Sequence, residues 1–282
     1  MIRFYLKYQN LFLVLCVLIA FSATLVASLF FPKYNNIILI VMILCISFVW
    51  TLTIVKIAKF SQILTEKCDP LEYLAESDKI LRGLNLDKLL KSTFNYKVSA
   101  GLLIDKATAL ILVGRYDEAL WIFDYIQRTV GNLQPFSMAI IYNDLAYICA
   151  VRGDIVQAQS YAAAQKNVCC ELETNKYLPK RFKKRYVFFE LLTTYMLIAY
   201  KSGDLTSAEE IGEQIESAQG FSKLELMKKV ELSFLIGTVK YELKKYDEAS
   251  NRLLIAANNG NTMIFHQQAI DILNKLNQGN LS

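Results

Sequence analysis

Few residues of this chain have the type and spacing that catalysis requires. The 282 residues include a single histidine, His266, so a metal site built from two or three histidines is excluded. The 11 glycines are scattered and form neither a G-x-G-x-x-G fingerprint nor a P-loop that would cradle phosphates. We therefore expect no enzyme activity, no catalytic residue, no cofactor and no metal, and we expect His266 to be an ordinary helix residue.

The cysteines also give little sign of chemistry. None of the six belongs to a C-x-x-C pair, which argues against a zinc site and against thioredoxin-like redox work. Two of them are adjacent, Cys169 and Cys170, and a redox role for this pair stays open. The favoured alternative is that both are small apolar residues packed on a helix.

One dense run of bases, interleaved with aromatic residues, lies near residue 180. Such a run can bind anionic lipid headgroups, an acidic protein, or the phosphates of RNA with its rings stacked on the bases. The leading alternative is a solvated linker and helix face. Because an adjacent membrane anchor is predicted below, lipid is favoured over nucleic acid, and we expect no nucleic-acid partner. The possible lipid contacts are Lys176, Lys180, Arg181, Lys183, Lys184 and Arg185.

The charge and the apolar residues are unevenly distributed. The chain has 31 Lys and Arg and 26 Asp and Glu, and five of the bases lie in residues 1–60, which hold no acid. The net charge of +5 therefore belongs entirely to this first segment. The remainder is neutral overall, which argues against a basic domain for nucleic acid.

Residues 1–60 are predicted to form a two-span membrane anchor. Residues 11–31 and 37–55 are uncharged and long enough to cross the roughly 30 Å hydrocarbon core as helices. Pro32 begins a turn between them. A cleaved signal peptide is the alternative for the first span. More bases flank the outer ends than the loop, so both chain termini, and the domain after residue 60, are predicted to be cytoplasmic at the cell membrane.

The remaining residues are predicted to be helical, with one turn signature repeated four times. Apolar residues recur at i, i+3, i+4 and i+7, which is the helical period. The turns begin at Gly114, Gly153, Gly203 and Lys244, and each is followed five residues later by an alanine, Ala119, Ala158, Ala208 and Ala249. A glycine can end one helix in the left-handed conformation, and the small alanine lets two helices approach closely.

This pattern over residues 97–260 resembles the tetratricopeptide repeat (TPR) family, with four divergent units whose spacing exceeds the usual 34 residues. The short segment after the spans, CDPLEYL, is similar to membrane-linked TPR proteins of Gram-positive bacteria. The resemblance implies an all-α fold, a membrane helical hairpin followed by an α-solenoid. Residues 61–96 and 261–282 would then supply capping helices at its two ends. A generic helical bundle is the alternative.

The resemblance also implies a concave groove lined by the first helix of each pair. Such a groove suits a peptide or a protein segment held by apolar side chains. The expected function is a membrane-tethered scaffold that binds a protein partner, with a peptide-responsive sensor as the alternative and an enzyme with an unrecognised site as the least favoured. After Ile104 and Thr108 in the first unit, the expected groove residues are Asn143, Tyr147, Thr193, Leu197, Tyr200, Phe234, Thr238 and Tyr241.

Overall fold

The described part of the chain is built from helices. The computed structural model describes residues 59–91, 96–174 and 180–279, with single positions at 22, 40, 47 and 55; for residues 173, 174 and 180–188 only the backbone is described. These residues contain helices and turns and no strand, which confirms the all-α prediction.

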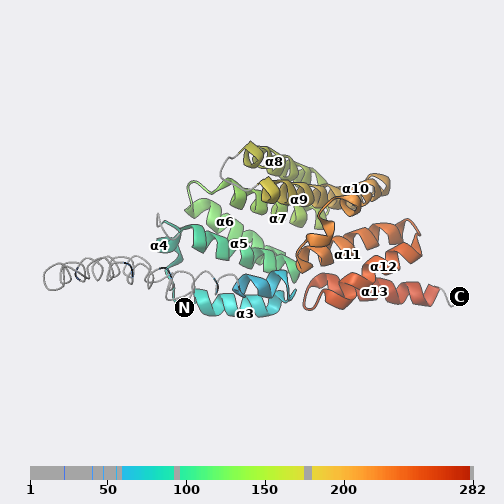
Figure 1. Cartoon of the computed structure of the whole chain (residues 1–282), viewed down its shortest axis with the longest axis horizontal. Helices are drawn as coiled ribbons and strands as arrows, with labels where there is room; N and C mark the ends of the chain where they lie inside the picture. The colour runs from blue at the N-terminus through green and yellow to red at the C-terminus, as the bar shows by residue number, and fades with distance from the viewer. Residues whose placement is uncertain are drawn as a thin grey trace.

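Four helix pairs follow two N-terminal helices, and one further helix ends the fold (Figure 1). A helical segment at 59–65 precedes α3 (Pro70–Leu81) and the short α4 (Leu86–Leu90). The pairs are α5 (Tyr96–Leu112) with α6 (Tyr116–Thr129), α7 (Pro135–Val151) with α8 (Ile155–Thr174), α9 (Lys180–Lys201) with α10 (Leu205–Ser217), and α11 (Leu226–Glu242) with α12 (Tyr246–Asn259). The 3-10 turn η2 (Phe221–Lys223) precedes α11, and α13 (Ile264–Gly279) comes last.

All four predicted turns close in the same way. The second residue after the end of each first helix has a positive φ: +79° at Gly114, +83° at Gly153, +85° at Gly203 and 61° at Lys244. In each turn the next backbone amide donates to the carbonyl five residues earlier, as from Arg115 to Leu110 at 2.8 Å. This is the hydrogen-bond pattern of a Schellman cap. Lys244 adopts it although a lysine, unlike a glycine, is disfavoured at positive φ.

The four signature alanines lie where the paired helices meet. Ala119, Ala158, Ala208 and Ala249 are each 0% exposed. A larger side chain at any of them would meet the neighbouring helix, because protein interiors are close-packed. The predicted burial of these alanines is confirmed.

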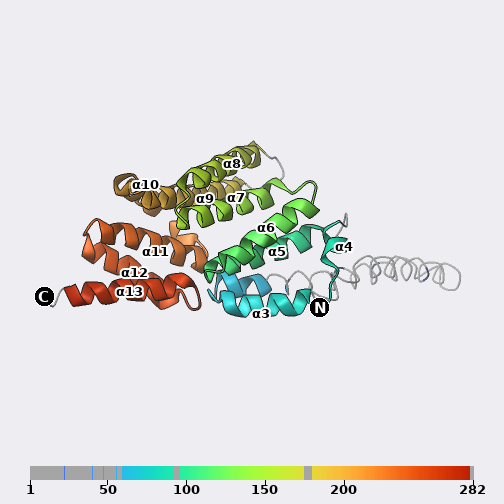
Figure 2. The same ribbon diagram turned by 180° about the vertical axis from the view of Figure 1, so that it is seen from behind.

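The two ends of the described chain contact each other. The hydroxyl of Thr262, just before α13, donates to the Asp69 carboxylate at 2.7 Å and accepts from the Leu71 amide at 3.3 Å. The side-chain amide of Asn261 donates to the Lys67 carbonyl at 3.2 Å. Figures 1 and 2 show α3 and α13 end to end along one edge, with the helix pairs curving between them. The helices expected to cap opposite ends of a solenoid therefore meet, and the curve of helix pairs is closed.

A shared core supports this closure. One continuous cluster of buried side chains contains Phe60 and Tyr73 from the beginning of the described chain and Leu253 and Phe265 from its end. The Phe60 and Tyr73 rings stack at 4.4 Å between centroids, and Phe234 stacks on Phe265 at 5.1 Å. A second cluster fills the space between α7, α8, α9, α10 and α11.

The predicted membrane anchor is not placed by the structure. Residues 11–31 and 37–55 lie almost entirely outside the described residues, so the hairpin stays a sequence prediction. Within the part of the chain that is described, no helix combines the length and the apolar character needed to cross a bilayer.

Candidate functional site

A cavity of about 430 Å³ lies on the inner side of the closed curve of helices. Its wall is formed mainly by α5, α7, α9 and α11, the first helices of the four pairs, because equivalent helices of successive pairs face the same side. The helical segment at 59–65 and the start of α13 complete it. Its apolar lining includes Leu64, Ile111, Leu112, Phe136, Ile140, Tyr147, Phe189, Leu224, Met227 and Phe265.

The polar part of this cavity is dominated by carboxylates, which sequence reasoning did not single out. Five acids line it, and the one base beside them is Lys228. The cavity wall therefore carries an excess of negative charge when its acids are ionised. The five acids are Asp105, Asp144, Glu190, Glu225 and Glu231.

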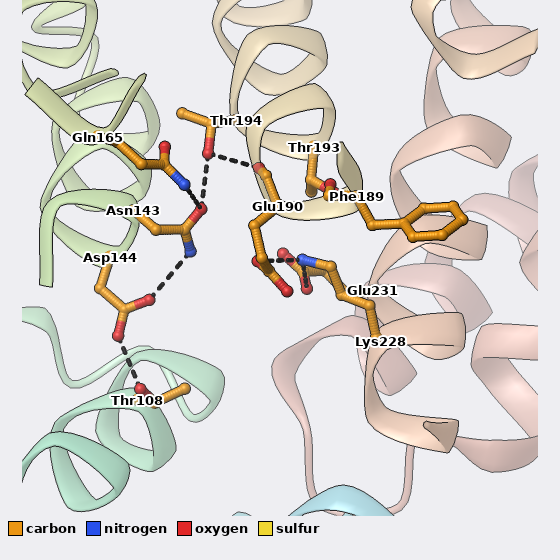
Figure 3. Close-up of polar contacts among 10 residues, drawn as sticks. All are labelled: Thr108, Asn143, Asp144, Gln165, Phe189, Glu190, Thr193, Thr194, Lys228 and Glu231. Atoms are coloured by element: carbon orange, nitrogen blue, oxygen red, sulfur yellow. Dashed lines mark hydrogen bonds and ion pairs between the residues drawn. The ribbon is translucent and has the colours of Figure 1, made fainter. Parts of the chain in front are cut away.

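Asn143 is the centre of a hydrogen-bond network that joins three helices (Figure 3). Its side-chain oxygen accepts from the Thr194 hydroxyl of α9 at 2.6 Å and from the Gln165 amide of α8 at 3.3 Å. Its side-chain nitrogen donates to Asp144 at 3.2 Å. Gln165 is fully buried, so this network fixes the orientation of Asn143 at the cavity wall.

Asp144 is held by neutral donors. The Thr108 hydroxyl of α5 donates to one of its oxygens at 2.7 Å, and the Asn143 amide donates to the other. Burial raises the pKa of Asp144 to about 7; these two hydrogen bonds oppose the rise, and the nearby charges of Glu190 and Glu231 add to it. Asp144 therefore titrates near neutral pH.

Asp105 lies one helical turn before Thr108, on the same side of α5. The Tyr73 hydroxyl lies 3.5 Å from its carboxylate, and burial raises the pKa of Asp105 to about 6. Among the described residues, no Lys, Arg or His lies within ion-pair distance of Asp105 or Asp144. Both acids thus face the cavity with neutral hydrogen-bond partners.

A buried ion triplet stands opposite these two acids. The Lys228 ammonium lies 2.8 Å from Glu190 and 2.9 Å from Glu231, and all three side chains are less than one-fifth exposed (Figure 3). Burial lowers the pKa of Lys228, but the two adjacent carboxylates outweigh it and hold that pKa above its usual value. Lys228 stays protonated, and the triplet keeps a net charge of one negative unit when both glutamates are ionised.

The structure divides the predicted groove residues among two cavities and the core. Asn143, Tyr147 and Thr108 line the cavity described above. A second cavity of about 330 Å³ shares Tyr147 and is bordered by α13 through Gln268, Asp271, Ile272 and Lys275. Four further predicted groove residues line this second cavity, namely Leu197, Tyr200, Phe234 and Thr238.

The other predicted groove residues line neither cavity. Thr193 is 4% exposed, and its hydroxyl donates to the Phe189 carbonyl of its own helix at 2.6 Å. Ile104 belongs to the core. Tyr241 packs its ring against Tyr246, with centroids 6.0 Å apart.

The predicted basic stretch can be placed only in part. Lys176 lies outside the described residues, and the backbone at Lys180, Arg181, Lys183, Lys184 and Arg185 forms the beginning of α9. Lipid contact by these bases stays a prediction.

One feature of the sequence indicates two of the acids that line the cavity. Asp144 is the single charged residue of α7, and Glu190 stands alone among uncharged residues between Tyr186 and Lys201 of α9. A lone charge in an otherwise apolar helix is costly to bury, so it indicates a paired group or a polar cavity. The identity of its neighbours requires the packing of four helices.

Metal and thiol chemistry receive no support from the described residues. Within the described ranges, no three His, Cys, Asp or Glu side chains are grouped to hold a metal ion. Burial raises the pKa of Cys68 to about 11 and also raises that of Cys149, so neither is an activated thiolate. Cys169 is buried beside Ala139 and Leu172, whereas Cys170 is exposed, so the adjacent thiols face different surroundings.

Comparisons with protein-family models, curated proteins and solved structures found no match to this chain.

Proposed function

We propose that this protein is a membrane-tethered, TPR-like binding protein that holds a peptide or a segment of a partner protein in its central cavity. The cavity of about 430 Å³ beneath the four helix pairs is the observation that carries this proposal. Ligand sites are typically concave, largely apolar and provided with a few fixed polar groups, and this cavity has all three features.

The fixed polar groups support binding rather than catalysis. Asn143 offers amide groups whose orientation is set by Thr194 and Gln165. Its oxygen already accepts two hydrogen bonds and one N–H donates to Asp144, so the second N–H is left to donate to a backbone carbonyl of a bound peptide. Tyr147 adds a rigid aromatic surface that borders both cavities, so one extended ligand can contact the two.

The TPR-like assignment and the membrane tether enter this proposal from the sequence. The four turns with equal closure, each followed by a buried alanine, are features expected of TPR-like helix pairs. The uncharged segments 11–31 and 37–55 would place the cavity at the cytoplasmic face of the membrane.

Photo-cross-linking from inside the cavity tests the proposal. We would replace Tyr147 by the aromatic photo-cross-linker p-benzoyl-phenylalanine in the full chain and irradiate intact membranes. The matched control places the same group at Trp121, which is 64% exposed on the outer side of α6. Mass spectrometry of the adducts should identify one recurrent peptide segment joined at position 147 and not at position 121. Adducts found only at position 121 would show that the cavity is not the binding site.

A sensor is the second candidate, favoured by one observation. Ser61, Leu64 and Thr65 line the cavity, and they follow the predicted second span within ten residues. A ligand would therefore touch the segment that joins the domain to the membrane. Cross-linking efficiency between cysteines introduced at positions 61 and 227, which both line the cavity, should change on ligand binding in a sensor and stay constant in a scaffold.

A further inference from the structure

We propose that the central cavity selects a peptide segment that carries one basic side chain, lysine or arginine, between apolar side chains. This inference rests on the proposed peptide-binding function and names the ligand chemistry. It depends on the charge of the cavity wall and on the arrangement of the acids within it.

The charge balance of the cavity favours a cation. Five carboxyl groups and one ammonium group line it. Lys228 already lies between Glu190 and Glu231, at 2.8 and 2.9 Å, so its charge is taken up within the triplet. An acidic ligand would meet uncompensated carboxylates, and an added cation would reduce their repulsion.

Outside the triplet, the cavity has Asp105, Asp144 and Glu225; because Glu225 is exposed, Asp105 and Asp144 are the enclosed acids left for such a cation. Asp144 is 6% exposed, and it accepts hydrogen bonds from the Thr108 hydroxyl and the Asn143 amide. Asp105 lies on α5, one helical turn before Thr108, and the Tyr73 hydroxyl is 3.5 Å from its carboxylate. A buried carboxylate gains most from a charged donor when its existing partners are neutral. These two side chains and Thr108 thus form a polar recess on the α5–α7 side of the cavity.

The rest of the wall suits the stem and neighbours of a basic side chain. Leu64, Ile111, Ile140, Met227 and Phe265 supply an apolar lining around the polar recess. Lysine and arginine carry a long apolar stem below the charged group, and the stem packs well on such surfaces. The apolar area also favours aliphatic or aromatic residues beside the base.

Selection from a library of random short peptides tests this inference. The full-length chain would be solubilised in detergent and immobilised, and bound peptides would be sequenced. We expect Lys or Arg to be enriched about tenfold over leucine at one position, the size of a single charge-assisted contact. The double variant Asp105→Asn with Asp144→Asn should lose this enrichment while still binding apolar peptides. Glu213→Gln, at an exposed acid of α10 that lines neither cavity, is the matched control and should retain it.

The other possible results of the selection distinguish failure of this inference from failure of the proposed function. Peptides selected without a basic residue, or with one that does not depend on Asp105 and Asp144, would overturn this inference and leave the proposed function intact. If no peptide is selected, both fail. A final experiment measures the binding of butylammonium and butylguanidinium, which are analogues of the lysine and arginine side chains. If they bind in a manner dependent on Asp105 and Asp144 while no peptide does, the ligand is a free amine and the peptide proposal is wrong.

Discussion

The hydroxyl of Thr262 donates a hydrogen bond to the carboxylate of Asp69 at 2.7 Å, across 193 residues of sequence. The same carboxylate oxygen caps α3 by accepting from the backbone amide of Glu72 at 3.0 Å. One aspartate thus begins the first capping helix and joins it to the loop before the last helix. This contact closes the curve of helix pairs around the two cavities.

Removing the closing hydroxyl should weaken the fold. Thr262→Val keeps the shape of the side chain but leaves Asp69 without this donor. We expect the free energy of unfolding to fall by about 0.5–1.5 kcal/mol, the usual net value of one hydrogen bond. Chemical denaturation of the full-length chain, followed by the helical circular dichroism signal, measures this change. Thr206→Val, at an exposed position of α10, is the control and should have a smaller effect.

A glycine at the fourth turn should stabilise the protein. Lys244 has a φ of 61°, in the left-handed region that costs a non-glycine residue roughly 1 kcal/mol. Lys244→Gly should therefore raise the free energy of unfolding by about 0.5–1 kcal/mol, since relief of strain exceeds the added entropy of the unfolded chain. The reciprocal variant Gly203→Lys, where a Cβ meets nothing within 4 Å, should lower it. An unstable Lys244→Gly variant would mean that the lysine side chain itself contributes to the turn.

The buried carboxylate of Asp144 should make stability depend on pH. Its pKa is raised to about 7, above the value of about 3.9 for an unfolded aspartate. At pH values between these two pKa values, the folded chain holds the Asp144 proton and the unfolded chain has lost it. The free energy of unfolding should therefore fall as pH rises from 4 to 8.

The isosteric variant Asp144→Asn isolates this effect, because its amide can still pair with Thr108 and Asn143. It should match the wild type near pH 4 and become more stable than the wild type near pH 8, by roughly 1–4 kcal/mol. Denaturation curves of both proteins across this range provide the measurement. A constant difference between them at every pH would show that Asp144 does not titrate in this window.

Enlarging a buried signature alanine should disturb the contact between paired helices. Ala158 is 0% exposed, so Ala158→Leu forces the α7–α8 interface apart and should cost about 1–3 kcal/mol. Ala163 lies on an exposed side of the same helix, and Ala163→Leu is the matched control. Equal melting temperatures for the two variants would contradict close packing at the signature alanine.

Much of the local structure is determined by the sequence, because it depends on residues close together in the chain. The turns at Gly114, Gly153 and Gly203 were predictable from the preference of glycine for the left-handed cap. The turn at Lys244 was found only because its neighbours repeat the same pattern. Burial of the alanine five residues later follows from the geometry of two antiparallel helices.

Only the tertiary structure decided which side chains face the cavity and that the chain closes on itself. The curvature of stacked helix pairs is the sum of small rotations between successive pairs, and irregular linkers set each rotation. Contacts such as Thr262 with Asp69 depend on that sum, so no local pattern reveals them. For the same reason no local pattern tells that Thr193 and Tyr241 line neither of the two cavities, or that Asp105, Glu190 and Lys228, from three different helices, line the same one.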